Sequence, residues 1–500
     1  MDVEPHLQSM RQTAGLADWV YVALAVFIGV VLLHEWYVSR RKRTLLVNIP
    51  LQRKVCQVYA VLACLITFLM SAMFVPLSLD FAYSLDQTAS ASGVLVGVQT
   101  LAALLGTLAG KSLINETEWV QPTVRRLLIA IEIARTICLF GLAIFLNHTA
   151  QSQMKCLVWY VNFAGVIVAN VLLGLPTVPV TLFWSKTTAP GNRTVWMVVG
   201  QVARNIGAAI GPVVFAAVNL AVSQGGPPLS PRRVMALVNV ISCFLACITL
   251  SLLVFVIPTT LPEPLPEMDV GTEGTSTSAE SMPETLEDVD REAVYWKLVM
   301  YFFERPMTLA AVETSMTMML EIFYDWQASV SGFCFTIMCP LGACMAILLK
   351  FLVHYGCLRE SVVLFSSMVV TILGALLFFD AGGAGSGTLM AAGTIIYTGA
   401  SVSNGIADGW GSRAAKEGST FGQAKYQFLK LLGCNASRFV GDLMGRSLVQ
   451  YGGRNAYAGF QLFLCLVGTK IVYKACSPIW RMEKQKRESQ ERAGRSLLRF

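Results

Sequence analysis

The sequence predicts an all-α polytopic membrane protein with two pseudo-symmetric halves of six helices and one extra helix before them. Three observations lead to this prediction: the composition, the long apolar segments and the distribution of basic residues between those segments. Of the 500 residues, 55% are hydrophobic and only 14% are charged, and the mean hydropathy is +0.58. In a soluble protein about a quarter of the residues are charged, so the apolar excess of this chain has to face lipid.

The apolar segments are long enough to span a bilayer. A helix that crosses a hydrocarbon layer of about 30 Å needs about 20 mostly apolar residues. Thirteen segments meet this criterion, the first of which precedes the two halves. The predicted spans are residues 18–37, 55–80, 92–110, 124–146, 156–183, 195–222, 234–256, 307–324, 330–351, 361–379, 388–409, 430–449 and 456–473.

A long acidic segment separates the two halves. Residues 258–291 are rich in proline, serine, threonine and acidic side chains, a composition that cannot bury a core. We expect a cytoplasmic loop there that is disordered or partly helical near its end. The predicted units are an N-terminus with an extra span and a basic loop, a first half, an acidic loop, a second half and a basic tail, over residues 1–54, 55–257, 258–305, 306–474 and 475–500.

Basic residues predict the orientation in the membrane. Lysine and arginine stay on the cytoplasmic side, and residues 40–43 and 53–54, directly after the first span, are all basic. We therefore expect a luminal or extracellular N-terminus and a cytoplasmic C-terminus. The connection 223–233 departs from this pattern because it ends in two arginines. The first span has no small-residue cleavage site, so we expect it to be a retained anchor.

Several function classes find no support in the sequence. The 13 cysteines are scattered singly and the four histidines lack ligand spacing, so neither a metal site nor a cofactor is expected. The net charge of +7 comes from residues between spans and at the C-terminus, which does not favour nucleic-acid binding. No nucleophile motif or membrane-embedded His/Asp cluster indicates an enzyme.

The fifth span of each half carries the same motif, R-x-x-G-x-x-x-G. Recurrence at the equivalent span is typical of duplicated transporter halves. Glycines four residues apart let two helices approach backbone to backbone, so we expect them to pack helices. The motif comprises Arg204, Gly207 and Gly211, followed by Pro212, in the first half, and Arg438, Gly441 and Gly445 in the second.

The two arginines of this motif differ in their local surroundings. A charge within a span costs about 2.5–3.5 kcal/mol on insertion scales, so it faces the bundle interior or water. Arg438 has Asp442 four residues later on the same helix face, which makes a structural ion pair one interpretation. Arg204 has no acid within a turn, so its counter-charge is either on another helix or a bound anion. Both arginines are candidates for binding an anionic substrate, and Arg204 is the stronger one.

Acidic residues within the spans fall into three groups. Glu132 and Arg135 are three residues apart and are expected to form an ion pair. Glu313 and Glu321 have no basic neighbour along their helix, which makes them candidates for proton coupling. Pairing of Glu313 with an arginine from another helix is an equally simple interpretation. Asp80, at the luminal end of its span, is a candidate substrate-binding residue or a solvated terminus.

One sequon falls on the predicted luminal face. Asn147 begins Asn-His-Thr in a short connection, and it is the candidate for a glycan. Asn115, Asn192 and Asn435 also begin sequons, but they fall on the predicted cytoplasmic side or inside a span.

Several of these features resemble a known family. The two halves of six spans, the acidic central loop and the G-x-x-x-G-P motif at 207–212 resemble the major facilitator superfamily. Residues 75–85, 92–97 and 324–326 are similar to the vacuolar phosphate transporters that carry an SPX domain. Lysosomal and vacuolar members of that branch also share the Arg-x-x-Gly pattern of the eleventh helix. The similarity covers residues 55–474, but no SPX domain precedes the bundle, and the loop after the second helix lacks the usual aspartate.

The resemblance implies a major-facilitator-type bundle of two halves that rock about a site near the bilayer midplane. It also implies a secondary transporter of a small, anionic or inorganic solute, with protons as a coupling partner and a monomer in the bilayer. Arg204 and Arg438 would supply positive charge to the cavity, or salt bridges that latch the halves, and Glu313 would carry the proton. A channel or a non-transporting scaffold or receptor is the alternative function. A vacuolar or lysosomal membrane and the plasma membrane are both compatible locations.

Overall fold

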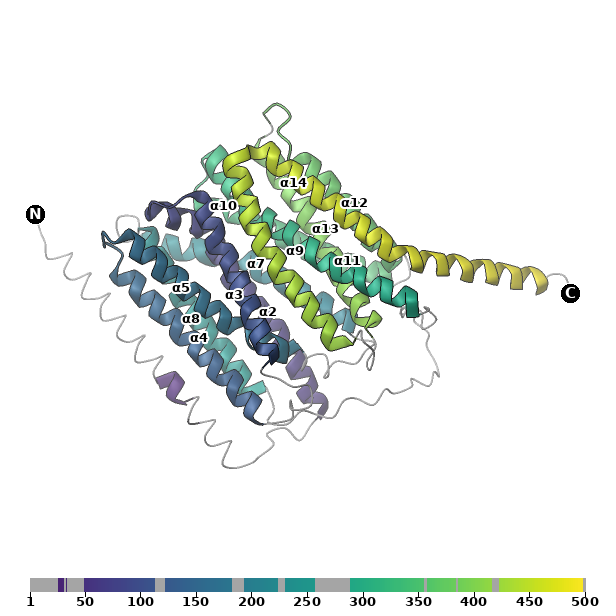
Figure 1. Cartoon of the computed structure of the whole chain (residues 1–500), viewed down its shortest axis with the longest axis horizontal. Helices are drawn as coiled ribbons and strands as arrows, with labels where there is room; N and C mark the ends of the chain where they lie inside the picture. The colour runs from purple at the N-terminus through teal and green to yellow at the C-terminus, as the bar shows by residue number, and fades with distance from the viewer. Residues whose placement is uncertain are drawn as a thin grey trace, which may run out of the picture.

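The described part of the protein is a bundle of helices. The computed structural model describes residues 26–30, 33, 49–112, 122–181, 193–223, 230–256, 288–354, 358–383, 385–415 and 422–497. These residues form helices and short turns and contain no strand. The helices lie side by side, with the last part of the final helix extending beyond the bundle (Figure 1).

Each half contributes its own set of helices. The first half comprises α2 (Ile49–Ser84), α3 (Ala89–Ser112), α4 (Pro122–His148), α5 (Lys155–Gly174), α7 (Arg193–Ser223) and α8 (Pro231–Val256). The second half comprises α9 (Asp288–Tyr324), the short α10 (Ala328–Ser331), α11 (Phe333–His354), α12 (Glu360–Leu377), α13 (Ser386–Ala414) and α14 (Gln423–Leu497).

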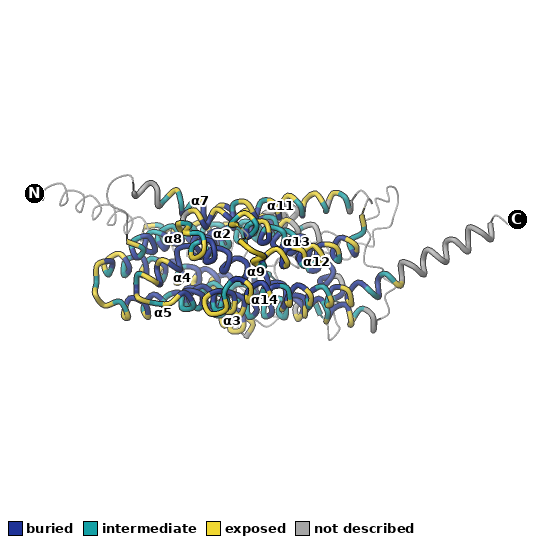
Figure 2. Tube along the Cα trace, turned by 90° about the horizontal axis from the view of Figure 1, so that it is seen from above, coloured by how far each residue is buried: buried dark blue, intermediate teal, exposed yellow. Residues whose placement is uncertain are grey.

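The outer surface of the bundle is suited to lipid. Eight of the described helices are long and apolar enough to cross a membrane. Large apolar side chains such as Tyr160, Phe244 and Phe463 are more than half exposed, and buried residues concentrate between the helices (Figure 2). The protein is therefore an all-α, multi-pass membrane protein. The number of thirteen spans stays a prediction, since most of the first predicted span lies outside the described residues.

Helix α9 begins earlier than the sequence suggested. Its span was predicted to start at residue 307, after an acidic loop that ran to residue 305, but the helix starts at Asp288. Val294, Leu298 and Tyr301 are fully buried in a cluster with side chains of α12, α13 and α14. Their spacing of three and four residues is that of one helix face, so this stretch belongs to the bundle. The rest of the acidic loop lies outside the described residues.

Helix α14 contains two predicted spans, 430–449 and 456–473, and continues into the predicted tail. The chain breaks its helical path at Gly453, whose φ is +72° and ψ −172°. A residue with a side chain rarely adopts that conformation, and glycine adopts it without steric cost. The last turns up to Ile479 are partly buried against the second half.

The repeated glycine motif packs in the same way in both halves. The motif on α7 faces α2, and the motif on α14 faces α9, so the fifth helix lies on the first helix of its own half. A Cβ atom added at any of the four glycines would collide with the neighbouring helix. The clashes are Gly207 with the Leu65 carbonyl at 2.2 Å, Gly211 with the Leu69 carbonyl at 2.7 Å, Gly441 with the Met307 carbonyl at 2.4 Å, and Gly445 with Ser315 Oγ at 2.4 Å.

Candidate functional site

Three charged side chains meet between the two halves. Arg204 is on α7 of the first half, whereas Glu313 on α9 and Arg438 on α14 belong to the second. Arg204 Nη2 lies 3.8 Å from Glu313 Oε1, and Arg438 Nη2 donates a hydrogen bond to Glu313 Oε2. The three side chains are 14%, 11% and 15% exposed, so the cluster is largely withdrawn from solvent. One carboxylate is thus shared by two arginines that belong to different halves.

An aromatic ring supports both guanidinium groups. The ring of Phe68 on α2 has its centroid 4.4 Å from Cζ of Arg204 and 6.0 Å from Cζ of Arg438. Close packing of Gly207 on α2 brings Arg204, one turn earlier, to this ring. Cation–π contacts of this kind stabilise a guanidinium by about 0.5–2 kcal/mol. The ring therefore helps to hold two like charges near each other.

The cluster has more hydrogen-bond donors than acceptors. Nε and Nη2 of Arg204 and Nη1 of Arg438 are buried without a hydrogen-bond partner in the described part of the chain. The distance of 3.8 Å from Arg204 to Glu313 gives an ion pair but no hydrogen bond. Two arginines share the Glu313 carboxylate, and the Asp442 carboxylate lies close enough to Arg438 to interact with its charge. Guanidinium donors without a partner are suited to a carboxylate or another oxyanion.

Polar side chains continue the site towards α13. Asn205, next to Arg204, is fully buried, and its Oδ1 accepts hydrogen bonds from Gln201 Nε2 at 3.2 Å and Tyr397 Oη at 3.4 Å. Tyr397 on α13 lies close enough to Glu313 and Arg204 to interact with both charges. The site therefore extends from the arginines along α7 to the second half.

The other acids that the sequence singled out form no ion pair with this cluster in the described part of the chain, although Asp442 lies close enough to Arg438 and Glu313 to interact with their charges. Asp442 is buried, but among the described residues Arg438 pairs with Glu313 instead of Asp442. Asp442 lies towards α3, where Gly97 faces its Cβ, whereas the Arg438 side chain reaches across to α9. Asp80 is exposed near the end of α2, and Glu321 accepts a hydrogen bond from Ser331. Neither of these two acids joins the cluster of Arg204, Glu313 and Arg438.

The structure contains the predicted ion pair on α4 and describes two of the sequon asparagines. Glu132 Oε1 lies 2.9 Å from Arg135 Nη1, and Thr249 on α8 donates a further hydrogen bond of 2.8 Å to the same oxygen. Asn147 is exposed at the end of α4, and Asn435 is inside α14. The sequons at Asn115 and Asn192 lie outside the described residues.

Sequence reasoning missed a fully buried arginine that connects the halves. Arg446 on α14 donates hydrogen bonds to Ser92 Oγ of α3, to the Val75 carbonyl of α2 at 3.2 Å and to the Thr314 carbonyl of α9 at 3.4 Å. Its side chain is 1% exposed. The signal in the sequence that could have identified Arg446 is a charge inside a predicted span, directly after the repeated motif.

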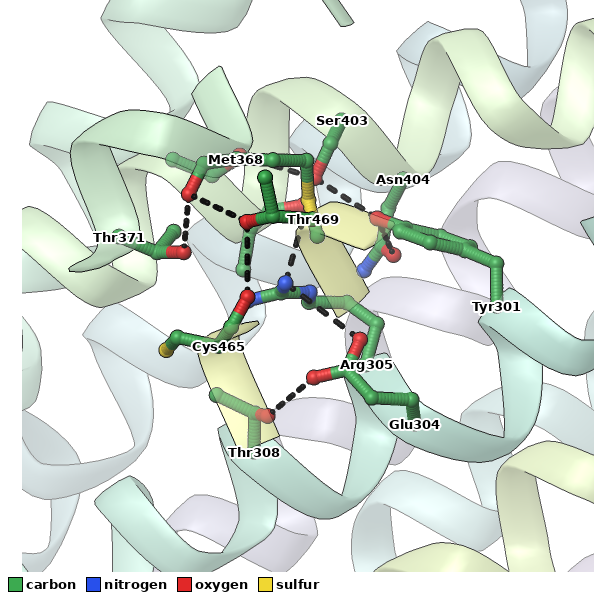
Figure 3. Close-up of polar contacts among 12 residues, drawn as sticks. Tyr301, Glu304, Arg305, Thr308, Met368, Thr371, Ser403, Asn404, Cys465 and Thr469 are labelled. Carbon is green, nitrogen blue, oxygen red and sulfur yellow. Dashed lines mark hydrogen bonds and ion pairs between the residues drawn. The ribbon is translucent and has the colours of Figure 1, made fainter. Parts of the chain in front are cut away.

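Sequence reasoning also missed a buried pair within the second half (Figure 3). Arg305 is fully buried, and its Nη2 lies 3.4 Å from Glu304 Oε2 and 3.1 Å from the sulfur of Met368. Thr308 donates a hydrogen bond of 2.7 Å to the other oxygen of Glu304. Both charged residues fell in the predicted acidic loop, and only the early start of α9 places them in the core.

The fold is shared with solved transporters. Human organic anion transporter MFSD10 (TETRAN) matches with 15% identity and a TM-score of 0.54, over 84% of this chain and 99% of that one. The xylose transporter XylE from E. coli matches with 14% identity and a TM-score of 0.61, over 84% and 97%. A bacterial homologue of the iron transporter ferroportin matches with 12% identity and a TM-score of 0.56, over 84% and 99%. At these identities the similarity concerns the fold alone.

Comparison of the sequence with protein-family models identifies the family of the chain. No curated protein sequence matches the chain. The family model for the Major Facilitator Superfamily matches residues 59–434, which is most of the chain and runs from α2 to the start of α14. The chain belongs to the major facilitator superfamily, a family of membrane transporters.

Proposed function

We propose that this protein is a secondary active transporter that moves a small anion by alternating access, with Glu313 as the carrier of a coupled proton. The observation that carries the proposal is the sharing of Glu313 between Arg204 of one half and Arg438 of the other. Unpartnered guanidinium donors favour an anion at this place. The site lies between halves that rock relative to each other in this family.

Competition for the guanidinium groups supplies the coupling. A bound anion and the Glu313 carboxylate both require the donors of Arg204 and Arg438. When Glu313 takes up a proton it loses its charge, and both arginines become available to the anion. Binding of the anion and of the proton then favour each other, as thermodynamic linkage requires. The expected mode is symport of anion and proton.

Other titratable groups face Glu313 and have to be considered as proton carriers. They are Tyr397 of α13, Cys339 of α11 and Asp442 of α14, each close enough to interact electrostatically with Glu313. Tyrosine and cysteine ordinarily hold their protons at neutral pH, so Asp442 is the competing carboxylate. Glu313 is favoured because, among the acids that the structure describes, it is the one that pairs with both arginines.

Transport by the purified protein in proteoliposomes tests the proposal. Labelled phosphate, lactate and malate are offered in turn with and without an acidic exterior. We expect saturable uptake of at least one anion, and an inward proton gradient should drive it above the equilibrium level. Non-saturable flux down the anion gradient that ignores pH would indicate a channel instead. Folded protein that moves none of a broad anion panel would indicate a scaffold or receptor.

A further inference from the structure

A second group of unpartnered polar atoms lies beside the arginines. Asn205 Oδ1 accepts two hydrogen bonds, from Gln201 and from Tyr397, and Nδ2 is the donor that remains. Asn205 is fully buried, and Nδ2 has no hydrogen-bond partner among the described residues. A buried amide donor without an acceptor is unfavourable, which suggests that a ligand supplies the acceptor.

A serine from the other half faces the same place. Ser401 on α13 is 1% exposed, and its Oγ also has no partner in the described part of the chain. Between the two lies Gly342 of α11. A Cβ atom added at Gly342 would stand 3.1 Å from Ser401 Oγ and 3.4 Å from Asn205 Nδ2. Both polar atoms therefore lie beside the backbone of Gly342, and because residue 342 is glycine, no Cβ stands against them.

We propose that Asn205 and Ser401 form a hydrogen-bonding subsite for a hydroxyl or carbonyl group of the substrate. The inference rests on the proposed function, with the charged group of the substrate held by Arg204 and Arg438. Asn205 accepts a hydrogen bond from Tyr397, which lies close enough to Arg204 and Glu313 to interact with both charges, so the polar subsite adjoins the charged cluster. The substrate class is then a small organic anion with a hydroxyl or keto group, such as a hydroxycarboxylate.

The chemistry of the two side chains fits such a group. The amide Nδ2 only donates, whereas the serine hydroxyl donates or accepts, so together they satisfy a hydroxyl or a carbonyl oxygen. An anion without this group leaves both side chains unpartnered, which lowers its affinity. Asn205 belongs to the first half and Ser401 to the second, so movement of the halves assembles and opens the subsite.

Thermal stabilisation of the purified full-length protein in detergent tests this subsite. The probes are two matched pairs, lactate with propionate and malate with succinate, together with inorganic phosphate. For the wild type we expect the hydroxylated member of a pair to bind about fivefold to tenfold more tightly, the effect of about one net hydrogen bond. The variants are Gly342→Ala, which places a methyl group against both polar atoms, and Ser401→Ala, which removes one of the two polar groups with little change in volume. The control is Gly459→Ala, where an added Cβ meets nothing within 4 Å.

Both variants should reduce the preference for the hydroxylated acid to nearly one and leave the affinity for its unsubstituted partner unchanged. The control should keep the preference of the wild type. Equal affinities within each pair for the wild type, or an unchanged preference in both variants, would overturn the subsite while anion binding stands. If none of the anions stabilises the wild type, the proposed function fails first and the subsite with it.

Discussion

Helix α9 carries two buried glutamates with different kinds of partner. Glu313 pairs with Arg204 of the first half and Arg438 of the second, at side-chain exposures of 11–15%. Glu304 pairs with its own neighbour Arg305 inside the second half, at exposures of 5% and 0%. Under the proposed alternating access, a carboxylate shared between the two halves changes partners during transport, whereas a pair within one half does not. We therefore propose that Glu313 takes part in the transport cycle and that Glu304 stabilises the second half.

The largest expected effect is the loss of accumulation in Glu313→Gln. The amide resembles the protonated acid and cannot release a proton, so exchange of substrate continues but a pH gradient no longer drives uptake. Accumulation in proteoliposomes measures this, with Glu321→Gln as the control because Glu321 lies outside the cluster. Retained accumulation in Glu313→Gln together with its loss in Glu321→Gln would transfer proton coupling to Glu321.

The next largest effect is a loss of folding stability in Arg305→Met, which should leave the coupling of uptake to the proton gradient unchanged. Arg305→Met leaves the buried carboxylate of Glu304 without its counter-charge, which costs about 3–5 kcal/mol. Unfolding in mixed detergent micelles measures the loss, and the double variant Glu304→Gln with Arg305→Met should recover most of it. A stable Arg305→Met protein that no longer couples uptake to pH would contradict the distinction between the two glutamates, because it would place Glu304 in the transport cycle.

A smaller effect is expected for Arg204→Lys. Lysine keeps the charge but lacks the planar fork that binds an oxyanion through two donors. Anion affinity should fall about tenfold to a hundredfold, the equivalent of about 1.5–3 kcal/mol, while stability changes little because Arg438 still pairs with Glu313. Ligand-dependent melting temperatures measure both quantities.

The latch interpretation of Arg204 makes a different prediction. If the arginine only holds the halves together, Arg204→Ala destabilises the protein, by less than the about 3–5 kcal/mol of a buried charge left alone, because Arg438 still pairs with Glu313. Anion affinity of the folded protein would then be unaffected. A stable Arg204→Ala variant with the affinity of the wild type would exclude both roles.

The smallest effect is expected at the surface. Lys155 and Asp86 form an ion pair of 2.7 Å with side-chain exposures of 38% and 72%. Exposed pairs contribute about 0–1 kcal/mol, so Lys155→Ala should change neither the melting temperature nor uptake measurably. A clear loss of stability in this variant would mean that the detergent assay overstates ion pairs, and the value for Arg305→Met would need the same correction.

Local features of the sequence were sufficient for much of this description. Hydrophobic segments of bilayer length and too few charges predicted a multi-pass helical bundle, because both properties can be counted along the chain. The repeated motif predicted the equivalent fifth helices and the glycines that pack them. The sequence also predicted Arg204 and Glu313 as candidate site residues, because neither has a partner of opposite charge within a turn of its own helix.

Contacts between helices were decided only by the tertiary structure. Asp442 is at the right spacing to pair with Arg438, yet the rotation of α14 directs that arginine to Glu313. Glu304 and Arg305 followed an acidic stretch typical of a loop, and their burial depends on how α9 packs against the other helices of the second half. Asn205, Gly342 and Ser401 are far apart in the chain and meet only where three helices converge. The sequence determined where most helices form and which charges lie within the predicted spans, because both follow from local hydrophobicity and spacing. The burial of Glu304 and Arg305 and the pairing of the buried charges depend on the rotation and distance of whole helices, which only the packed bundle sets.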